Sequence, residues 1–594
     1  MSTVLTRRQP PAQERVISDD SGKDEPETTT TSLSDDLGLG VALEQKKFFW
    51  QRSKKYDPNA IATLPSVFDD PETAEKYHPS QEWENYHRFD PSARWTWGEE
   101  QKLVRKIDIR IMIFAVVMFM ALEIDRSNLA QALSDNFLSD LGLETNDYNL
   151  GNTIFKLTFL LSELPSQLVS KWMGPDRWIP TQMTIWSIVA ASQFWLSGRS
   201  SYLACRALLG ILQGGFIPDV ILYLSYFYKH HELSIRLGYF WTGMSFADII
   251  SALMAYGLLH MRGVAGYAGW RWLFMIEGIV TFVVGISAYA LMPAGPCHTA
   301  SWLRGKNGWF NEREQTIIVN RVLREDPSKS GMHNRQPVTP KLLWQSLKDY
   351  DLWPLYFIGM VFQMPTTPQT QYLTLTLKGL GFGTFQVSLL SIPQYVGHSK
   401  YHIITTRSVS LSPVANLVST VIMMLILTYV GEIWGELTWT AMLGQIWSFP
   451  LLVSMVALNL GTINKWVLYA ILVLLLSYPN AHPIQVGWNS RNSNAVRSRT
   501  VSAACYNMFV QAGGIIASNI YRADDKPLYK RGNKVLLGLC CMNLVLYPLL
   551  RVYYVSRNKS RDKKWNALTE EQRLEYLNTT TDQGNKRLDF RFQY

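Results

Sequence analysis

Long apolar segments recur along this chain, and they constrain its fold more than any other feature. A helix that crosses a bilayer needs about 20 mostly apolar residues. Many of the segments contain Gly, Pro, Ser or Thr, which neighbouring helices accommodate in a membrane bundle. The pattern predicts an all-α integral membrane protein. The candidate spans, with ends uncertain by several residues, are 109–131, 149–171, 178–197, 201–227, 236–259, 271–292, 351–375, 384–430, 437–457, 465–484, 499–520 and 534–555.

A polar stretch between the sixth and seventh candidate spans divides them into two equal groups. This division is typical of transporters built from two pseudo-symmetric six-helix halves. In the last polar stretch, Thr569 and Gln572 form a capping-box start, which predicts a short helix over 568–577. The expected parts are a disordered cytosolic tail (1–95), a first half (96–292), a cytosolic central loop (293–350), a second half (351–555) and a cytosolic C-terminal tail (556–594).

Composition excludes several other classes of protein. Only 18% of the residues are charged and 12% are aromatic, whereas disordered chains carry much charge and few aromatic residues. The net charge of +9 fits an anionic membrane surface, and together with the apolar blocks it argues against a nucleic-acid partner. The 5 cysteines show no disulfide or zinc spacing, and we expect no metal and no cofactor. No enzyme motif is present, so we expect a protein without enzymatic activity.

The distribution of Lys and Arg predicts the orientation in the membrane. The segment before the first span, the central loop and the C-terminal stretch are all basic, whereas the loop after the first span is acidic. Both termini are therefore expected in the cytosol. The basic loop around 521–534 disagrees with this orientation, but the other loops agree with it. We see no signal peptide before the first apolar block, which begins near Ile109.

The eighth span contains an anomaly. Residues 395–413 are polar and include His398, Lys400, His402 and Arg407, although an apolar run resumes at Val414. A helix cannot carry such a block through hydrocarbon without a large cost. The block is interpreted as a retained intron or gene-model error, with a genuine re-entrant loop as the alternative.

Several motifs resemble those of the major facilitator superfamily, and within it the fungal anion:cation symporters typified by allantoate permeases. The resemblance extends over residues 95–594. It implies twelve helices and proton-coupled uptake of a small organic anion, such as allantoate, ureidosuccinate, a vitamin carboxylate or a sulfonate. The matching stretches are LEIDRSNLAQAL (122–133), SELPSQLVSKWMGPDRWIP (162–180), CRALLGILQGGFIPDVILYLS (205–225), GWRWLFMIEGI (269–279) and the region 477–533.

Ionisable residues within the first span are the leading functional candidates, because such residues are costly in hydrocarbon. Arg126 is the expected anion ligand and Asp125 the expected proton carrier. The alternative is a pair that only neutralises itself at the end of the span. Under the functional interpretation, protonation of Asp125 releases Arg126 from its partner and links proton loading to substrate loading.

The fourth span supplies a second set. Arg206 and Gln213 are seven residues apart and share one helical face. A galactonate transporter in the wider family has Glu at the position of Gln213, which cannot titrate here. Asp219 and Glu163 are therefore the next candidates for proton coupling, with a cap or a packing contact as the alternative. Glu277 is interpreted as an interfacial anchor beside Arg271.

Other polar residues complete the expected transport path. Lys156 adds positive potential to the cavity or snorkels towards the interface. In the seventh span, a helix broken at Pro365 and Pro368 would direct polar side chains inward or only shape packing. The expected further ligands are Gln363, Gln369, Asn507 and Gln511. The turn containing Gly174, Asp176 and Arg177 is either a gate, as in facilitators, or a plain turn.

The sequence thus predicts a monomeric, plasma-membrane symporter that works by alternating access. Its partners are the anion, the proton and the bilayer. One alternative is a nutrient-sensing transceptor, whose long tails would transmit the signal. The other is an organellar, for example vacuolar, exporter of the same fold.

Overall fold

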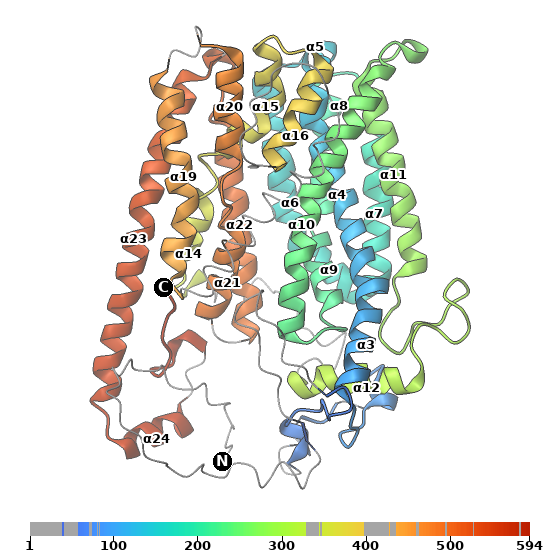
Figure 1. Ribbon diagram of the computed structural model, residues 1–594, viewed down its shortest axis with the longest axis vertical. Helices are drawn as coiled ribbons and strands as arrows, with labels where there is room; N and C mark the ends of the chain where they lie inside the picture. Colours follow the sequence, from blue (N-terminus) through green and yellow to red (C-terminus); the bar gives the residue numbers. More distant parts are fainter. Residues whose placement is uncertain are drawn as a thin grey trace.

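The computed structural model describes residues 39–40 and most of 57–594; the chain is an upright bundle of helices (Figure 1). α3, α12 and α24 lie at one end of the bundle, here called the basal end, and α5 lies at the other, the distal end. Within 57–594, the positions not described are 71–73, 76, 80, 82, 328–343, 345–346, 397–426, 428–434, 459–462, 494–495, 527 and 581–583.

The N-terminal half follows the expected spans closely. A short amphipathic helix, α3 (Trp97–Ile107), is capped by Thr96 and Glu99 and runs through a π-helical turn into the first span. The fourth span is broken at Gly214 and Gly215. The spans are α4 (Ile113–Ala132), α6 (Thr145–Met173), α7 (Pro175–Ser192), α8 with α9 (Arg199–Gln213, Phe216–Leu224), α10 (His230–Leu258) and α11 (Gly269–Leu291), and α5 (Phe137–Asp140) is a short distal turn.

The C-terminal half contains two broken spans. The seventh is interrupted over 362–366, beside Pro365, and the tenth over 477–481, beside Pro479. The described part of the eighth span ends at Val396, so 397–413 of the anomalous block lies outside the described residues. The elements are α14 (Trp353–Val361), α15 (Thr367–Gly379), α16 (Thr384–Val396), α19 (Leu437–Ala457), α20 (Lys465–Leu476), α21 (His482–Ser493), α22 (Val496–Ser518) and α23 (Lys530–Asn566).

Proline, glycine and polar interruptions leave few uniformly apolar helices. Among the described residues, 5 helices are long and apolar enough to cross a membrane by length and composition. They correspond to the fourth, fifth, sixth, ninth and twelfth expected spans. The described parts of the other expected spans are shorter, broken or carry more polar residues, as helices surrounded by other helices can.

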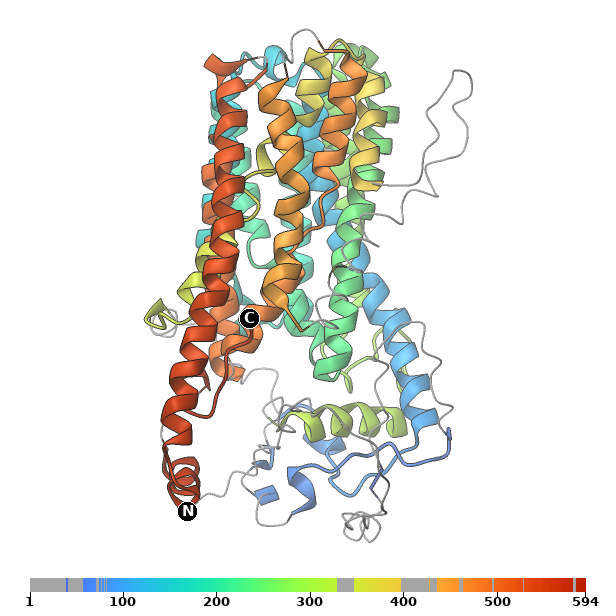
Figure 2. The same ribbon diagram turned by 60° about the vertical axis from the view of Figure 1, so that its left-hand side comes forward.

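α23 is the longest helix and projects beyond the rest of its half at the basal end (Figure 2). The chain then forms α24 (Glu570–Thr579), which begins at the expected Thr569–Gln572 capping box and confirms that prediction. The last residues return to the bundle: Trp488 Nε1 donates to the carbonyl of Gln593 (2.7 Å). The C-terminal tail is therefore packed against its own half.

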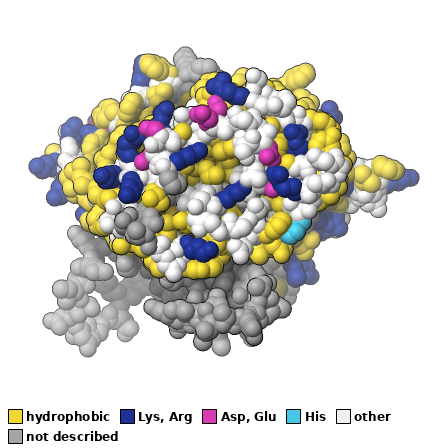
Figure 3. Space-filling model, turned by 90° about the horizontal axis from the view of Figure 1, so that it is seen from above, with side chains coloured by type: hydrophobic (Ala, Val, Ile, Leu, Met, Phe, Trp, Pro, Cys, Tyr) yellow, Lys and Arg dark blue, Asp and Glu magenta, His cyan; other side chains and the backbone are white. Residues whose placement is uncertain are grey.

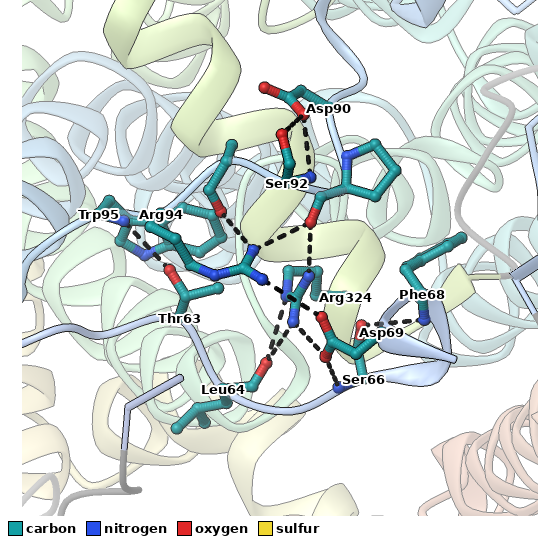
Figure 4. Close-up of polar contacts among 12 residues, drawn as sticks. Thr63, Leu64, Ser66, Phe68, Asp69, Asp90, Ser92, Arg94, Trp95 and Arg324 are labelled. Carbon is teal, nitrogen blue, oxygen red and sulfur yellow. Dashed lines mark hydrogen bonds and ion pairs between the residues drawn. The ribbon is translucent and has the colours of Figure 1, made fainter. Parts of the chain in front are cut away.

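Part of the segment expected as a disordered N-terminal tail is folded, so that prediction extends too far along the chain. Residues 57–70 and 83–96 pack on α12 (Glu312–Glu325), a helix of the central loop. Figure 4 shows Arg324 of α12 donating to the carbonyls of Leu64 (2.9 Å) and Pro91 (3.0 Å) and pairing with Asp69. We call these residues with α3 and α12 the basal module.

A buried charge cluster joins the basal module to the start of α10. Glu100 of α3 is 3% exposed, accepts a hydrogen bond from Trp95 Nε1 (2.7 Å), and pairs with Lys229 and Arg321. Arg321 also pairs with Glu232 of α10. Burial by itself would raise the pKa of the Glu100 carboxyl, but Arg321 and Lys229 outweigh burial and hold that pKa below its ordinary value of 4.5.

Candidate substrate and proton site

Close packing of α6 on α8 brings the candidate residues of these helices together. A Cβ atom built on Gly210 would lie 2.1 Å from Thr158 Oγ1, and one on Gly214 would lie 2.2 Å from Ser162 Oγ. No larger residue fits there without displacing α6. The small residues of the fourth span therefore allow the close helix approach that the sequence indicates.

Arg126 lies where α4, α6 and α8 meet. Its Nε donates to Gln213 Oε1 (3.0 Å), and its Nη1 pairs with Glu123 Oε1 (2.9 Å). The guanidinium also lies over the ring of Phe159, 5.1 Å from the centroid. The predicted pairing of Arg126 with Asp125 is wrong, because neighbouring residues point about 100° apart on a helix whereas Glu123, three residues earlier, shares a face with Arg126.

Arg206 and Lys156 are cations whose hydrogen-bond partners are neutral. Arg206, 5% exposed, donates from Nη2 to Asn152 Oδ1 (3.4 Å) and lies over the ring of Phe155 (4.5 Å). Lys156 Nζ donates to the carbonyl of Gly514 (2.8 Å) and to Ser518 Oγ (2.9 Å). Neither cation has a carboxylate partner among the described residues. Lys156 is thus directed across to α22 of the other half and does not snorkel.

Glu163 and Asp219 are buried carboxylates in the same region. Asn507 Nδ2, on α22, donates to Glu163 Oε2 (3.0 Å), so this contact also joins the two halves. Asp219 is 0% exposed and faces α6 beside Ser166 and Ser170. Gly215, one helical turn before Asp219, also lies against Ser166, so this face of α9 packs on α6.

Asp125 is directed away from α6. It is 1% exposed, and Trp186 Nε1 of α7 donates to its Oδ2 (3.1 Å). Glu277 lies nearby, 0% exposed, and accepts a hydrogen bond from Ser251 Oγ (3.4 Å). Its interpretation as an interfacial anchor with Arg271 is wrong, because Arg271 donates to the carbonyl of Leu196 (2.9 Å) at the distal end of the bundle.

The candidates of the second half lie on the broken seventh span and on α22. The backbone carbonyl of Gln363 accepts the Thr367 amide at the break (3.0 Å). Once the Gln369 side-chain amide is turned over, its nitrogen donates to the carbonyl of Pro365 (3.0 Å), and Gln369 then satisfies the interrupted backbone. Gln511 is half-buried on α22, one turn from Asn507.

The turn with the predicted gating residues joins α6 to α7 at the basal end. Gly174 has φ +86°, a left-handed conformation that favours glycine. Asp176 lies in the first turn of α7 near Arg304, and Arg177 is exposed. The geometry fixes a tight turn here, and a gating role stays a prediction.

The distal parts of the two halves are joined by many hydrogen bonds. Thr384 Oγ1 donates to the carbonyl of Ser134 (3.0 Å), and Asn149 Nδ2 donates to that of Tyr521 (2.7 Å). The contacts continue inward to Glu163 and Asn507 near the middle of the bundle. Viewed from the distal end, side chains cover the centre within a hydrophobic rim (Figure 3). This arrangement closes the distal side.

The comparisons with known proteins agree with this architecture. Residues 113–518 match the family model described as Major Facilitator Superfamily. The chain belongs to the major facilitator superfamily. It is 44% identical to the uncharacterized transporter YIL166C of Saccharomyces cerevisiae over 541 residues, which cover 90% of this chain and 95% of that protein. The protein is accordingly a multi-pass membrane transporter of small molecules and has no enzymatic role.

Two bacterial structures share its fold. A bacterial homolog of the human lysosomal transporter Spinster, in an inward-facing and unoccupied conformation, aligns at TM-score 0.53 with 12% identity. The xylose transporter XylE from E. coli, in a partially occluded inward-open conformation, aligns at TM-score 0.51 with 11% identity. Each alignment covers 75% of this chain and 97% of the other. This likeness establishes the major facilitator fold that the sequence predicts.

The sequence interpretation left out two half-buried carboxylates of the N-terminal half, Glu123 and Asp248, and assigned the buried Glu277 the wrong role. Glu123 is the partner of Arg126, Asp248 of α10 faces Glu123, and Glu277 faces Asp125. A signal for each was present, because an acidic residue within a long apolar run is costly unless it has a partner or a function. Their mutual proximity depends on the rotation of each helix, which the sequence does not specify.

Proposed function

We propose that this protein is a proton-coupled importer of a small organic anion that works by alternating access. The proposed substrate class comprises ureido-carboxylates such as allantoate or ureidosuccinate, vitamin carboxylates and sulfonates, as in fungal anion:cation symporters. The proposal places a monomer in the plasma membrane with the basal end and both termini in the cytosol. The basic residues of that end support this orientation.

The observation that carries the proposal is the pair of cations with neutral partners. Arg206 and Lys156 lie on facing helices, close enough to repel each other, and their described hydrogen-bond acceptors are amide, carbonyl and hydroxyl oxygens. Two neighbouring positive charges within a membrane bundle are costly without a counter-charge. A carboxylate or sulfonate supplies that charge, and the fork of an Arg side chain suits either group.

Lys156 links anion binding to movement of the two halves. Its ammonium holds α22 through Gly514 and Ser518 while the distal side is closed. An anion that takes over these hydrogen bonds weakens the contact between the halves. Binding then favours separation of the distal ends, as alternating access requires.

Proton coupling follows from the energetics of anion uptake. The membrane potential opposes entry of an anion into a negative-inside cell by about 2.3 kcal/mol per charge per 100 mV. At least one proton for each negative charge makes the transport electroneutral. Asp125, Glu163 and Asp219 are the proposed proton carriers, since Gln213 cannot titrate.

Uptake by the purified protein in liposomes tests the proposal. A panel of labelled ureido-carboxylates, vitamin carboxylates and alkyl sulfonates is offered with an inward proton gradient, with and without a protonophore. We expect saturable accumulation of at least one anion that the protonophore abolishes. Accumulation of only neutral or cationic compounds would overturn the proposal.

Cation-removing variants complete the test. Lys156→Gln and Arg206→Gln should each raise the KM for the anion at least tenfold, because each removes a charge-assisted hydrogen bond. Lys465→Gln is the matched control: it also removes a positive charge, but Lys465 lies over the ring of Phe382 at the distal end. An unchanged KM in both Lys156→Gln and Arg206→Gln would show that the anion binds elsewhere.

A further inference from the structure

A buried group of polar side chains lies inside the N-terminal half, on the side of α4 that faces away from α6. It includes Asp125 of α4 and Glu277 of α11, which accept hydrogen bonds from Trp186 of α7 and Ser251 of α10. α11 approaches α7 closely here, because a Cβ atom on Gly278 would lie 2.6 Å from the backbone nitrogen of Ala191. Asp125 and Glu277 are 1% and 0% exposed.

Only some of the polar atoms in this buried group have a hydrogen-bond partner. Asp125 Oδ2 accepts from Trp186 Nε1, and Glu277 Oε1 accepts from Ser251 Oγ. Asp125 Oδ1, Glu277 Oε2 and Asn128 Nδ2 have no partner at hydrogen-bond distance among the described residues, and all three atoms are buried. Asn128 is 1% exposed and lies on α4 beside Glu277. Asp125, Glu277 and Asn128 are thus buried neighbours that each have hydrogen-bonding capacity left over.

No cation of the surrounding helices is hydrogen-bonded to these two carboxylates. On α4, Arg126 attracts Asp125 only from a distance and gives its hydrogen bonds to Glu123 and Gln213. On α10, Asp248 adds a negative charge near Glu123. The other ionisable residues of α7 and α11 lie towards the ends of these helices; they are Asp176, Arg177 and Arg271.

The charge balance of the whole N-terminal half also indicates that some of its carboxylates are protonated. Between the ends of its spans, the described carboxylates outnumber the cations. The carboxylates are Glu123, Asp125, Glu163, Asp219, Asp248 and Glu277, and the cations are Arg126, Lys156 and Arg206. Some of these carboxylates must therefore carry protons.

We propose that Asp125 and Glu277 form a proton-sharing pair, buried inside the N-terminal half. Two neighbouring carboxylates in a low-dielectric site cannot both be ionised, so one proton binds to an oxygen of one side chain. The protonated carboxyl donates a hydrogen bond to the ionised one, and the Asn128 amide donates to the remaining oxygen. No other bond forms or breaks, and water supplies the proton.

The pair assigns a transport role to Glu277. The role in coupling rests on the proposed proton symport, whereas the bound proton follows from burial and proximity alone. A second proton on the pair would remove its remaining charge. A site that alternates between one and two protons is suited to couple proton movement to the conformational cycle.

Infrared difference spectroscopy tests the pair without any substrate. The purified protein in lipid nanodiscs is taken through a pH step in H₂O and in D₂O, and the carbonyl band of protonated carboxylic acids is recorded. We expect a band that shifts when Glu277→Gln or Asp125→Asn replaces one member, since the remaining acid loses its charged partner. The double variant should lose that band.

Two further variants distinguish loss of the proton-sharing pair from misfolding of the protein. Ser251→Ala keeps both carboxyls but removes the donor to Glu277, so the band should shift in frequency and keep its intensity. Glu436→Gln is the control, because Glu436 of the other half is ion-paired with Arg551 and should contribute no such band. If neither Glu277→Gln nor Ser251→Ala alters the band, the pair is overturned, whether or not a substrate is transported with protons. If the band behaves as expected but no anion is transported, the proposed function fails and the pair stands.

Discussion

The two halves of this transporter share one architecture but differ in the chemistry of their interiors. The N-terminal half places carboxylates and guanidinium groups between the ends of its spans. The described interior of the C-terminal half is built mainly from neutral groups: Gln445 donates to the carbonyl of Phe362 (2.8 Å), and Tyr506 donates to Gln485 Oε1 (2.7 Å). The first half is thus suited to bind charge, and the second half to hold broken helices in place.

The neutral network has a clear structural task. Gln445 and Asn543 donate to backbone carbonyls at the break in the seventh span, those of Phe362 and Val361. Unpaired carbonyls are costly in a membrane, where water cannot replace the lost helical hydrogen bond. The comparison teaches that a buried polar residue in such a bundle supports either the backbone or the chemistry, and that its partners distinguish the two roles.

Arg126→Ala should have the largest effect. It removes the guanidinium that bridges α4 and α8 and leaves Glu123 with an uncompensated charge, so saturable anion uptake should fall at least about 100-fold. The measurement is initial uptake rate against substrate concentration, normalised to protein in the membrane. Arg126→Lys keeps the positive charge but lacks the forked guanidinium, so its uptake rate should lie between those of wild type and Arg126→Ala. Wild-type affinity in Arg126→Ala would show that Arg126 does not bind the anion.

Asp125→Asn should separate binding from coupling. The variant cannot hold the proton on this residue, so it should exchange substrate downhill but lose accumulation against a gradient at acid external pH. The final inside-to-outside ratio of labelled substrate measures this loss. If Asp125→Asn concentrates substrate as wild type does, Asp125 is not the coupling carboxylate, and Asp219 is the next residue to test.

Gln445→Leu should affect stability and leave proton coupling unchanged. The substitution leaves the Phe362 carbonyl without its donor and should destabilise the protein by about 1–3 kcal/mol. Thermal unfolding in detergent measures the loss, and uptake at several pH values provides the functional check. A changed pH dependence of uptake would show that the C-terminal half also takes part in proton coupling.

Glu100→Gln should have the smallest effect on transport, because Glu100 lies in the basal module, away from the candidate substrate and proton site. The pKa of its carboxyl is held below 4.5, so its ionised form stabilises the fold fully above that value and loses the contribution as the pH falls through the lowered pKa. The variant should melt earlier than wild type at neutral pH, and the difference should shrink towards acid pH. Melting curves between pH 3 and pH 7 measure it, and a constant difference would contradict the charge-cluster explanation.

Local signals predicted much of this molecule. Apolar runs placed the spans, and the seventh span breaks beside Pro365, as its sequence indicates. The spacing of Arg206 and Gln213 correctly placed both on one buried face of α8. These features depend on residues within a few turns of one another, so composition and periodicity suffice.

Features that join distant segments were harder to predict. The pairing of Arg126 with Glu123 is local and could have been inferred from their separation of three residues, but the approach of Glu277 to Asp125 requires the orientation of α11 against α4. The folded segment before α3 was missed because its polar composition hides Phe68 and Trp95, which are buried in the basal module. Partners for these side chains come from elsewhere in the chain, notably from α12 for Phe68.

The length of α23 has a consequence for the membrane around the protein. Its stretch 535–550 carries no charged residue, and Val535, Val545 and Leu549 on it are exposed. At 1.5 Å per residue these 16 positions span about 24 Å, somewhat less than the roughly 30 Å hydrocarbon thickness of a typical bilayer. Lys534 precedes the stretch and Arg551 follows it. The length of this uncharged stretch sets the hydrophobic thickness that α23 matches. A bilayer much thicker than the stretch must therefore thin locally around the transporter.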